Sequence, residues 1–128
     1  MTGRPAVPVA GGRGRAVDPE RGSVTAELAV ALPAAVVLLV AVLVLAVAAT
    51  TQLRCADAAR AGARSAALGE DTATVSAVVT RLAGERAEVD VVRDGTWVTV
   101  SVRSVSTAGG LHLDPVQVGA TATARVEP

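Results

Sequence analysis

The order of hydrophobic and polar positions divides the chain into parts of different character. Residues 1–22 place four arginines among glycine and proline and have no apolar periodicity. Residues 28–49 are an unbroken run of 22 uncharged residues. As a helix rising about 1.5 Å per residue, this run would be about 33 Å long, and the hydrocarbon core of a bilayer is about 30 Å thick. The pattern predicts a disordered basic leader followed by one membrane span.

The residues after the span predict that its helix continues and that a shorter helix follows. Residues 50–68 are rich in alanine, so the membrane helix is expected to extend through them as a stalk. Gly69 interrupts this helix, and Asp71 or Thr72 can cap the next one, which ends at Gly84. Apolar residues recur on one face of this second helix with helical spacing, at Val75, Val78, Val79 and Leu82.

Alternation with a period of two predicts strands in the remainder. The dipeptide Asp94-Gly95 suits a two-residue type I′ turn, a register that pairs Arg93 with Thr96 and sets Trp97 opposite Val92. Residues 116–126 alternate again, so three antiparallel strands are expected, with both helices covering their apolar face. The predicted fold class is α+β. Its expected divisions are the leader at 1–22, a transmembrane and stalk helix at 23–68, and a small α+β domain at 69–128.

Composition argues against several classes of function. The 12 basic residues are all arginine and are balanced by 12 acidic residues, so no net positive charge favours nucleic acid. One histidine and one cysteine cannot make a multi-cysteine zinc site or an internal disulfide, and they offer little material for a catalytic site. We therefore expect no enzyme activity, no cofactor and no metal. His112, in a glycine-rich connection, is interpreted as structural.

The junction between leader and span carries an unexpected carboxylate, Glu27. An acidic residue costs about 2.5 to 3.5 kcal/mol at the centre of a membrane helix and less near the interface. One explanation is that the helix dipole favours an anion in the first turn. Another follows from spacing, because cleavage after Gly22 would create an amino terminus at Ser23 and make Glu27 the fifth residue. Between packed helices, that carboxylate could pair with the terminal ammonium of a neighbour.

This junction resembles the processing site of type IV prepilins, in which a basic leader ending in glycine precedes an apolar helix with glutamate at its fifth position. Within that group, residues 21–64 resemble the TadE-type minor pseudopilins of tight-adherence (Flp-type) pilus systems. The similarity is carried by Gly22 to Glu27, by Pro33, and by the segment from Asp57 to Arg64 after the span. Leu28 departs from the family, where an aromatic residue is usual, and Ala26 stands where valine is common.

The resemblance implies a function and a location. A membrane-embedded prepilin peptidase would remove residues 1–22, and residues 28–49 would hold the mature chain in the cytoplasmic membrane. The amino terminus would be cytoplasmic and the C-terminal domain extracytoplasmic. Helix packing, with Glu27 and Pro33 contributing, would then bring the subunit into a pilus or secretion apparatus. The implied partners are the peptidase, other pilin or pseudopilin subunits, pilus platform proteins and membrane lipid.

Other interpretations remain open at this point. A conventional signal peptidase could cut after Ala48 and release a small secreted domain, or the span could be a plain anchor that presents a binding domain. Cys55 lies just beyond the span and cannot form a disulfide within the chain. We interpret it first as a small buried side chain, with an intermolecular disulfide as the alternative.

Overall fold

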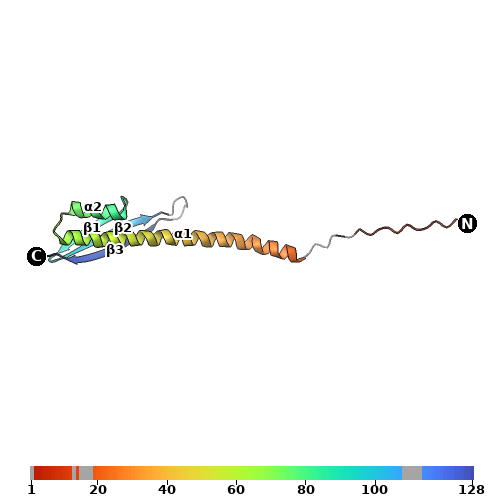
Figure 1. The fold of residues 1–128 in the computed structure, drawn as a ribbon, viewed down its shortest axis with the longest axis horizontal. Helices are drawn as coiled ribbons and strands as arrows, with labels where there is room; N and C mark the ends of the chain where they lie inside the picture. The colour runs from red at the N-terminus through yellow and green to blue at the C-terminus, as the bar shows by residue number, and fades with distance from the viewer. Residues whose placement is uncertain (1, 13, 15–18, 108–113) are drawn as a thin grey trace. The chain divides into compact units, whose positions relative to one another are not determined.

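The computed structural model describes residues 2–12, 14, 19–107 and 114–128. The chain divides into two units, Met1–Val37 and Leu38–Pro128. The predicted α+β class, with a long apolar helix, a second helix and a three-stranded antiparallel sheet, is confirmed. The elements follow in the order α1 (Pro19–Ala67), α2 (Thr72–Ala83), β1 (Glu88–Asp94), β2 (Trp97–Ser106) and β3 (Val116–Arg125) (Figure 1).

Helix α1 begins earlier than the sequence pattern suggested. Its first residue is Pro19, and Glu20 lies in its first turn. Proline suits the first helical position because the N–H that it lacks has no partner there, and an acidic residue in the first turn interacts favourably with the helix dipole. The last four residues assigned to the leader, 19–22, are therefore helical.

Helix α1 ends where the sequence predicted an interruption. Gly69 has a φ of +90°, which glycine adopts more readily than other residues. The turn is closed by backbone hydrogen bonds, since the N–H of Gly69 donates to the carbonyl of Ala66 and the N–H of Glu70 donates to that of Ser65. The chain can then reverse and start α2 five residues after α1 ends.

The stretch of α1 that was expected to form a stalk is packed into the domain. Its buried residues are small and lie on one helical face, as Cys55, Ala58, Ala59, Gly62, Ala63, Ser65 and Ala66. Together with Val75 and Val79 of α2, they cover the three inner valines of β2, Val98, Val100 and Val102. The predicted cover of the sheet by both helices is confirmed, although Leu82 of the predicted α2 stripe is 45% exposed.

The strand order is β1-β2-β3, antiparallel throughout, but the predicted hairpin register is wrong. Asp94 pairs with Trp97 and Arg93 with Val98, so the loop residues are Gly95 and Thr96. Only Gly95 has a positive φ, which fits a type II′ turn, whereas a type I′ turn on Asp94-Gly95 would require a positive φ at Asp94 as well. Trp97 consequently lies opposite Asp94 and Arg125, not opposite Val92.

Two polar side chains tie α1 to the sheet. The Arg93 guanidinium of β1 donates to the carbonyls of Ala66 (3.3 Å) and Glu70 (2.8 Å), in the turn between the helices. Near the other end of the sheet, the Gln52 amide donates to the carbonyl of Gly119 (2.7 Å) and accepts from its N–H (3.2 Å). Because Gln52 lies only three residues past Ala49, the domain begins directly at the end of the predicted span.

The predicted cap of α2 is confirmed as Asp71, whose carboxylate accepts from the N–H of Thr74 at 2.8 Å. Hydrogen bonds from Thr74, its side chain first and then its N–H, lower the pKa of Asp71. A pKa lowered on folding adds stability above the unfolded value of about 3.9, and that stability is lost as the pH falls through the folded value.

We expect Asp71→Ala to lower the melting temperature at pH 7, and we expect the difference from wild type to shrink towards pH 3. Thermal unfolding followed by circular dichroism measures both values. An equal difference at the two pH values would contradict this role for the charge of Asp71.

Candidate functional site

The residues of the candidate cleavage site lie at the start of α1, within the first unit. Gly22 and Ser23 are exposed and helical, and the peptide bond between them comes one turn after Pro19. The first turn of a helix has N–H groups without helical partners, and glycine is about 1 kcal/mol less favourable than alanine in a helix. One turn around the Gly22–Ser23 bond can therefore unwind at small cost.

Gly22 has no structural requirement for glycine. An added Cβ at this position would have no neighbour within 4 Å, and its φ does not lie in the left-handed region. Gly62, on the same helix, is the opposite case, because a Cβ there would lie 2.6 Å from Cγ2 of Val79 and 3.2 Å from Cγ1 of Val100. The fold explains the glycine at position 62 but not the one at position 22.

Glu27 is exposed on α1, four residues after Ser23. Residues at i and i+4 lie on the same helical face, so an amino terminus created at Ser23 would lie about one turn from this carboxylate. Among the described residues, the ion pair found is Arg60 with Asp57, at 3.6 Å and largely exposed, and it does not involve Glu27. Glu27 is thus available to a cation from outside the chain or from a new terminus.

The predicted span lies wholly within α1. A helix of this length and composition can cross a membrane or serve as a signal sequence, and α1 is the one that qualifies among the described residues. The leucine and valine side chains of residues 28–43 are mostly exposed, and Pro33 lies inside the helix without ending it. Just past the predicted span, the hydroxyl of Thr50 donates to the carbonyl of Ala46, and that of Thr51 donates to the carbonyl of Val47. These hydroxyl groups therefore need no water as a hydrogen-bond partner. The helix therefore presents an apolar surface that suits lipid or other apolar helices.

Cys55 is a core residue. Its side chain is 0% exposed, and burial raises the pKa of its thiol. This position favours the interpretation of Cys55 as a small buried side chain, since a disulfide with another chain would require the domain to open.

We expect Cys55 to react with maleimide only after the domain unfolds. Burial blocks access of the reagent to the sulfur, and the raised pKa lowers the fraction of the reactive thiolate. Mass spectrometry of the labelled full chain along a urea series measures this directly. Asp57→Cys in a Cys55→Ala background supplies an exposed cysteine on the same helix that should label at once. A disulfide-linked dimer of the native chain on non-reducing gels would contradict the prediction.

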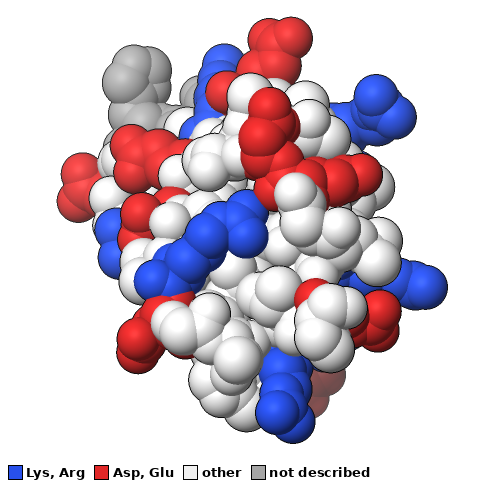
Figure 2. All heavy atoms as spheres, turned by 90° about the vertical axis from the view of Figure 1, so that its left-hand side faces the viewer, with Lys and Arg blue, Asp and Glu red and all other residues white. Residues whose placement is uncertain are grey.

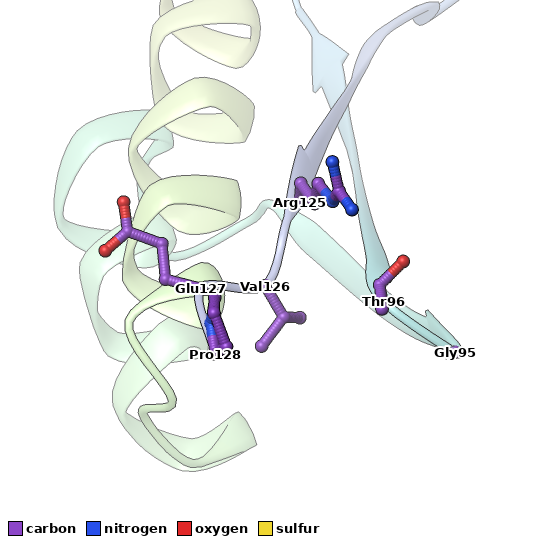
Figure 3. A pocket seen from close by; sticks show the side chains of 6 residues that line it. All are labelled: Gly95, Thr96, Arg125, Val126, Glu127 and Pro128. Carbon is purple, nitrogen blue, oxygen red and sulfur yellow. The ribbon is translucent and has the colours of Figure 1, made fainter.

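The end of the domain that holds the β1–β2 turn has a charged surface and an open hollow (Figure 2). Figure 2 shows acidic and basic side chains interspersed on the end that holds the β1–β2 turn. The hollow at that end is open, and Arg125 and Glu127 on its rim point in different directions (Figure 3). Among the described residues, no three histidine, cysteine or carboxylate side chains gather as a metal site would require. His112 lies outside the described residues.

One group of residues that the sequence analysis did not single out lines a second hollow, of about 400 Å³. We call it the Arg54–Arg86 hollow. Its lining comes from three places in the fold. These are Val47, Thr51 and Arg54 of α1, residues 83–86 at the end of α2 and just after it, and residues 104–107 at the end of β2 and just after it. The available sequence signal was a change along β2, where alternate valines give way to Ser104 and Ser106.

Comparison with known proteins identifies the N-terminal part of the chain. No match was found among the curated proteins or the solved structures. Residues 22–64 match the family described as TadE-like protein. The match begins at Gly22, includes Glu27, Pro33 and the apolar run, and ends within the part of α1 that packs in the domain. It confirms the resemblance drawn from the sequence: residues 22–64 are a TadE-like protein family domain.

Proposed function

We propose that the chain is the precursor of a minor pilin-like subunit. In this proposal a prepilin peptidase cuts between Gly22 and Ser23, residues 28–49 hold the mature chain in the cytoplasmic membrane, and the domain faces away from the cytoplasm. Packing of α1 against the helices of other subunits then incorporates the protein into a tight-adherence pilus or secretion apparatus. The protein acts as a structural component and not as an enzyme.

The observation that carries this proposal is the glycine at position 22. It is the first residue of the TadE-like match, it stands five positions before Glu27, and the fold has no use for a glycine there. Gly22 has no packing or backbone role in the fold, and recognition by the prepilin peptidase would explain why glycine stands there. The exposed apolar surface of residues 28–43 agrees with a helix that exchanges lipid for neighbouring helices.

The mature amino terminus tests this proposal. Intact mass and terminal peptides are measured on protein from native membranes, with and without the host's prepilin peptidase. A start at Ser23 that depends on the peptidase supports the proposal. A start at Ala49 would indicate a secreted domain, and an intact leader in the presence of the peptidase would indicate a plain membrane anchor; either result overturns the proposal.

Glu27→Gln is expected to reduce incorporation into the assembly strongly while leaving the chain in the membrane. The amide keeps the size and shape of the side chain but removes the charge that would pair with the ammonium of Ser23 in a neighbouring subunit. Recovery of the subunit in sheared pilus or apparatus fractions, relative to the membrane pool, measures the effect.

Glu20→Gln is the matched control, because Glu20 is also an exposed glutamate of α1 but belongs to the part that cleavage removes. It should assemble as wild type does. If Glu27→Gln assembles as well as Glu20→Gln, the charge at position 27 has no role in assembly.

A further inference from the structure

The Arg54–Arg86 hollow lies at the level where the apolar run ends. Val47, Thr51 and Arg54 follow one another at i, i+4 and i+7, so they share a helical face. Val47 belongs to the predicted span, and Arg54 lies five residues beyond Ala49. The axial distance from Val47 to Arg54 is about 10 Å at 1.5 Å per residue. A chain inserted through residues 28–49 would therefore hold this hollow at the boundary between acyl chains and headgroups.

The floor of the hollow is polar where the rest of the buried face of β2 is apolar. Val98, Val100 and Val102 are fully buried on that face, and the next two inward positions are Ser104 and Ser106, which are 7% and 9% exposed. Both serines line the hollow, and no hydrogen bond between described residues uses either hydroxyl. Two serines thus line a ligand-sized space at positions where valine would have extended the core.

The charges around the hollow suit an anion with a single negative charge. Among the described lining residues, Arg54 and Arg86 contribute two positive charges and Glu85 one negative charge, which gives these residues a net charge of +1. Guanidinium groups bind phosphate oxygens in a bidentate manner. A phosphodiester carries one negative charge, which this lining neutralises, and Val47 offers an apolar surface beside it.

We propose that the Arg54–Arg86 hollow binds the phosphodiester headgroup of a phospholipid in the leaflet next to the domain. The guanidinium groups of Arg54 and Arg86 hold the phosphate oxygens, Ser104 and Ser106 donate to them, and the acyl chains run along the end of the span at Val47. The bound lipid fixes the depth and rotation of the domain on the membrane. This inference rests on the proposed membrane span but does not require cleavage at Gly22.

The experiment measures lipid that stays bound to the full chain. The protein is reconstituted in nanodiscs of phosphatidylglycerol, transferred to dodecyl maltoside and examined by native mass spectrometry. Wild type is expected to retain one phosphatidylglycerol. Arg54→Gln combined with Arg86→Gln should reduce the retained fraction about tenfold, because two charge-assisted contacts are lost. The matched control, Arg64→Gln combined with Arg81→Gln, removes two exposed arginines of α1 and α2 outside the hollow and should retain lipid as wild type does.

Three results would overturn the inference. Equal retention by both double variants would show that the hollow does not hold the lipid. Equal retention of diglucosyl diacylglycerol, which has no phosphate, would show that acyl chains alone are recognised. Release of the lipid by millimolar inorganic phosphate would assign the hollow to a soluble anion.

Membrane insertion is measured separately, so that failure of the inference and failure of the proposed function can be told apart. A chain that resists alkaline carbonate extraction but retains no lipid overturns the inference alone. A chain that carbonate releases from the membrane overturns the span itself, and both proposals fail with it.

Discussion

Gly22→Ala is expected to leave the leader attached to almost all of the protein. Alanine adds a methyl group next to the bond that the proposed peptidase cuts, at a position where the family resemblance implies glycine. Alanine also stabilises the first turn of α1 by about 0.5 to 1 kcal/mol, which opposes the unwinding that a protease needs. Because the added Cβ would meet no atom within 4 Å, the fold itself should not change.

The measurement is the ratio of terminal peptides that start at Ser23 to peptides that span residues 22 and 23, in a strain with the peptidase. Gly12→Ala is the control within the leader, since an added Cβ there also meets nothing within 4 Å. That control should be processed as wild type is. A Gly22→Ala protein that still begins at Ser23 in full yield would remove the main support for the pilin-like proposal.

Local features of the fold could be predicted from the sequence because each depends on a few neighbouring residues. An unbroken apolar run makes a long apolar helix, Asp71 caps a helix through the N–H three residues later, and Gly69 and Gly84 end helices with φ angles of +90° and +97°. The candidate junction is similarly local, since Gly22 and Glu27 are separated by only five positions. Features of this kind do not depend on how distant elements pack.

The hairpin register depends on distant contacts and was therefore missed. Both registers place the same alternating valines on the inner face, so hydrophobic pattern cannot distinguish them. In the observed register Arg93 lies opposite Val98 and reaches the carbonyls of Ala66 and Glu70, in a turn more than 20 residues earlier in the chain. The type II′ turn needs a positive φ only at Gly95, whereas the predicted type I′ turn would need one at Asp94 as well.

The small residues of α1 were ambiguous for a related reason. Alanine favours helix in any surroundings, so residues 50–67 predicted a helix without indicating what it touches. Their burial under the sheet follows from the positions of α2 and β2, which the sequence of α1 does not contain. The Arg54–Arg86 hollow escaped prediction in the same way, because its lining is brought together from three elements by tertiary packing.

Gly62→Val is expected to destabilise the domain by about 3 kcal/mol, a large share of the 5 to 15 kcal/mol typical of a folded protein. Even one added carbon at position 62 would lie 2.6 Å from Cγ2 of Val79, and both Val79 and Val100 are fully buried and cannot turn aside. Gly62→Ala should cost less, because overpacking of about 1 to 3 kcal/mol is offset by about 1 kcal/mol of helix propensity.

Urea unfolding of the full chain in detergent, followed by the fluorescence of Trp97, measures these free energies, since Trp97 is the sole tryptophan. Gly22→Ala is the matched control on the same helix and should unfold at the wild-type urea concentration. The two glycine positions should thus give different defects: Gly22→Ala should lose processing but keep its stability, and Gly62→Val should lose stability.

A double variant tests the physical cause at Gly62. Val79→Ala removes the atom closest to the added Cβ, so Gly62→Ala with Val79→Ala should be more stable than the sum of the two single changes predicts. Residues in contact show coupling of about 0.5 to 3 kcal/mol in such cycles. Strict additivity would mean that the clash with Val79 is not what requires glycine, and the close packing of α1 on α2 would then lose its explanation.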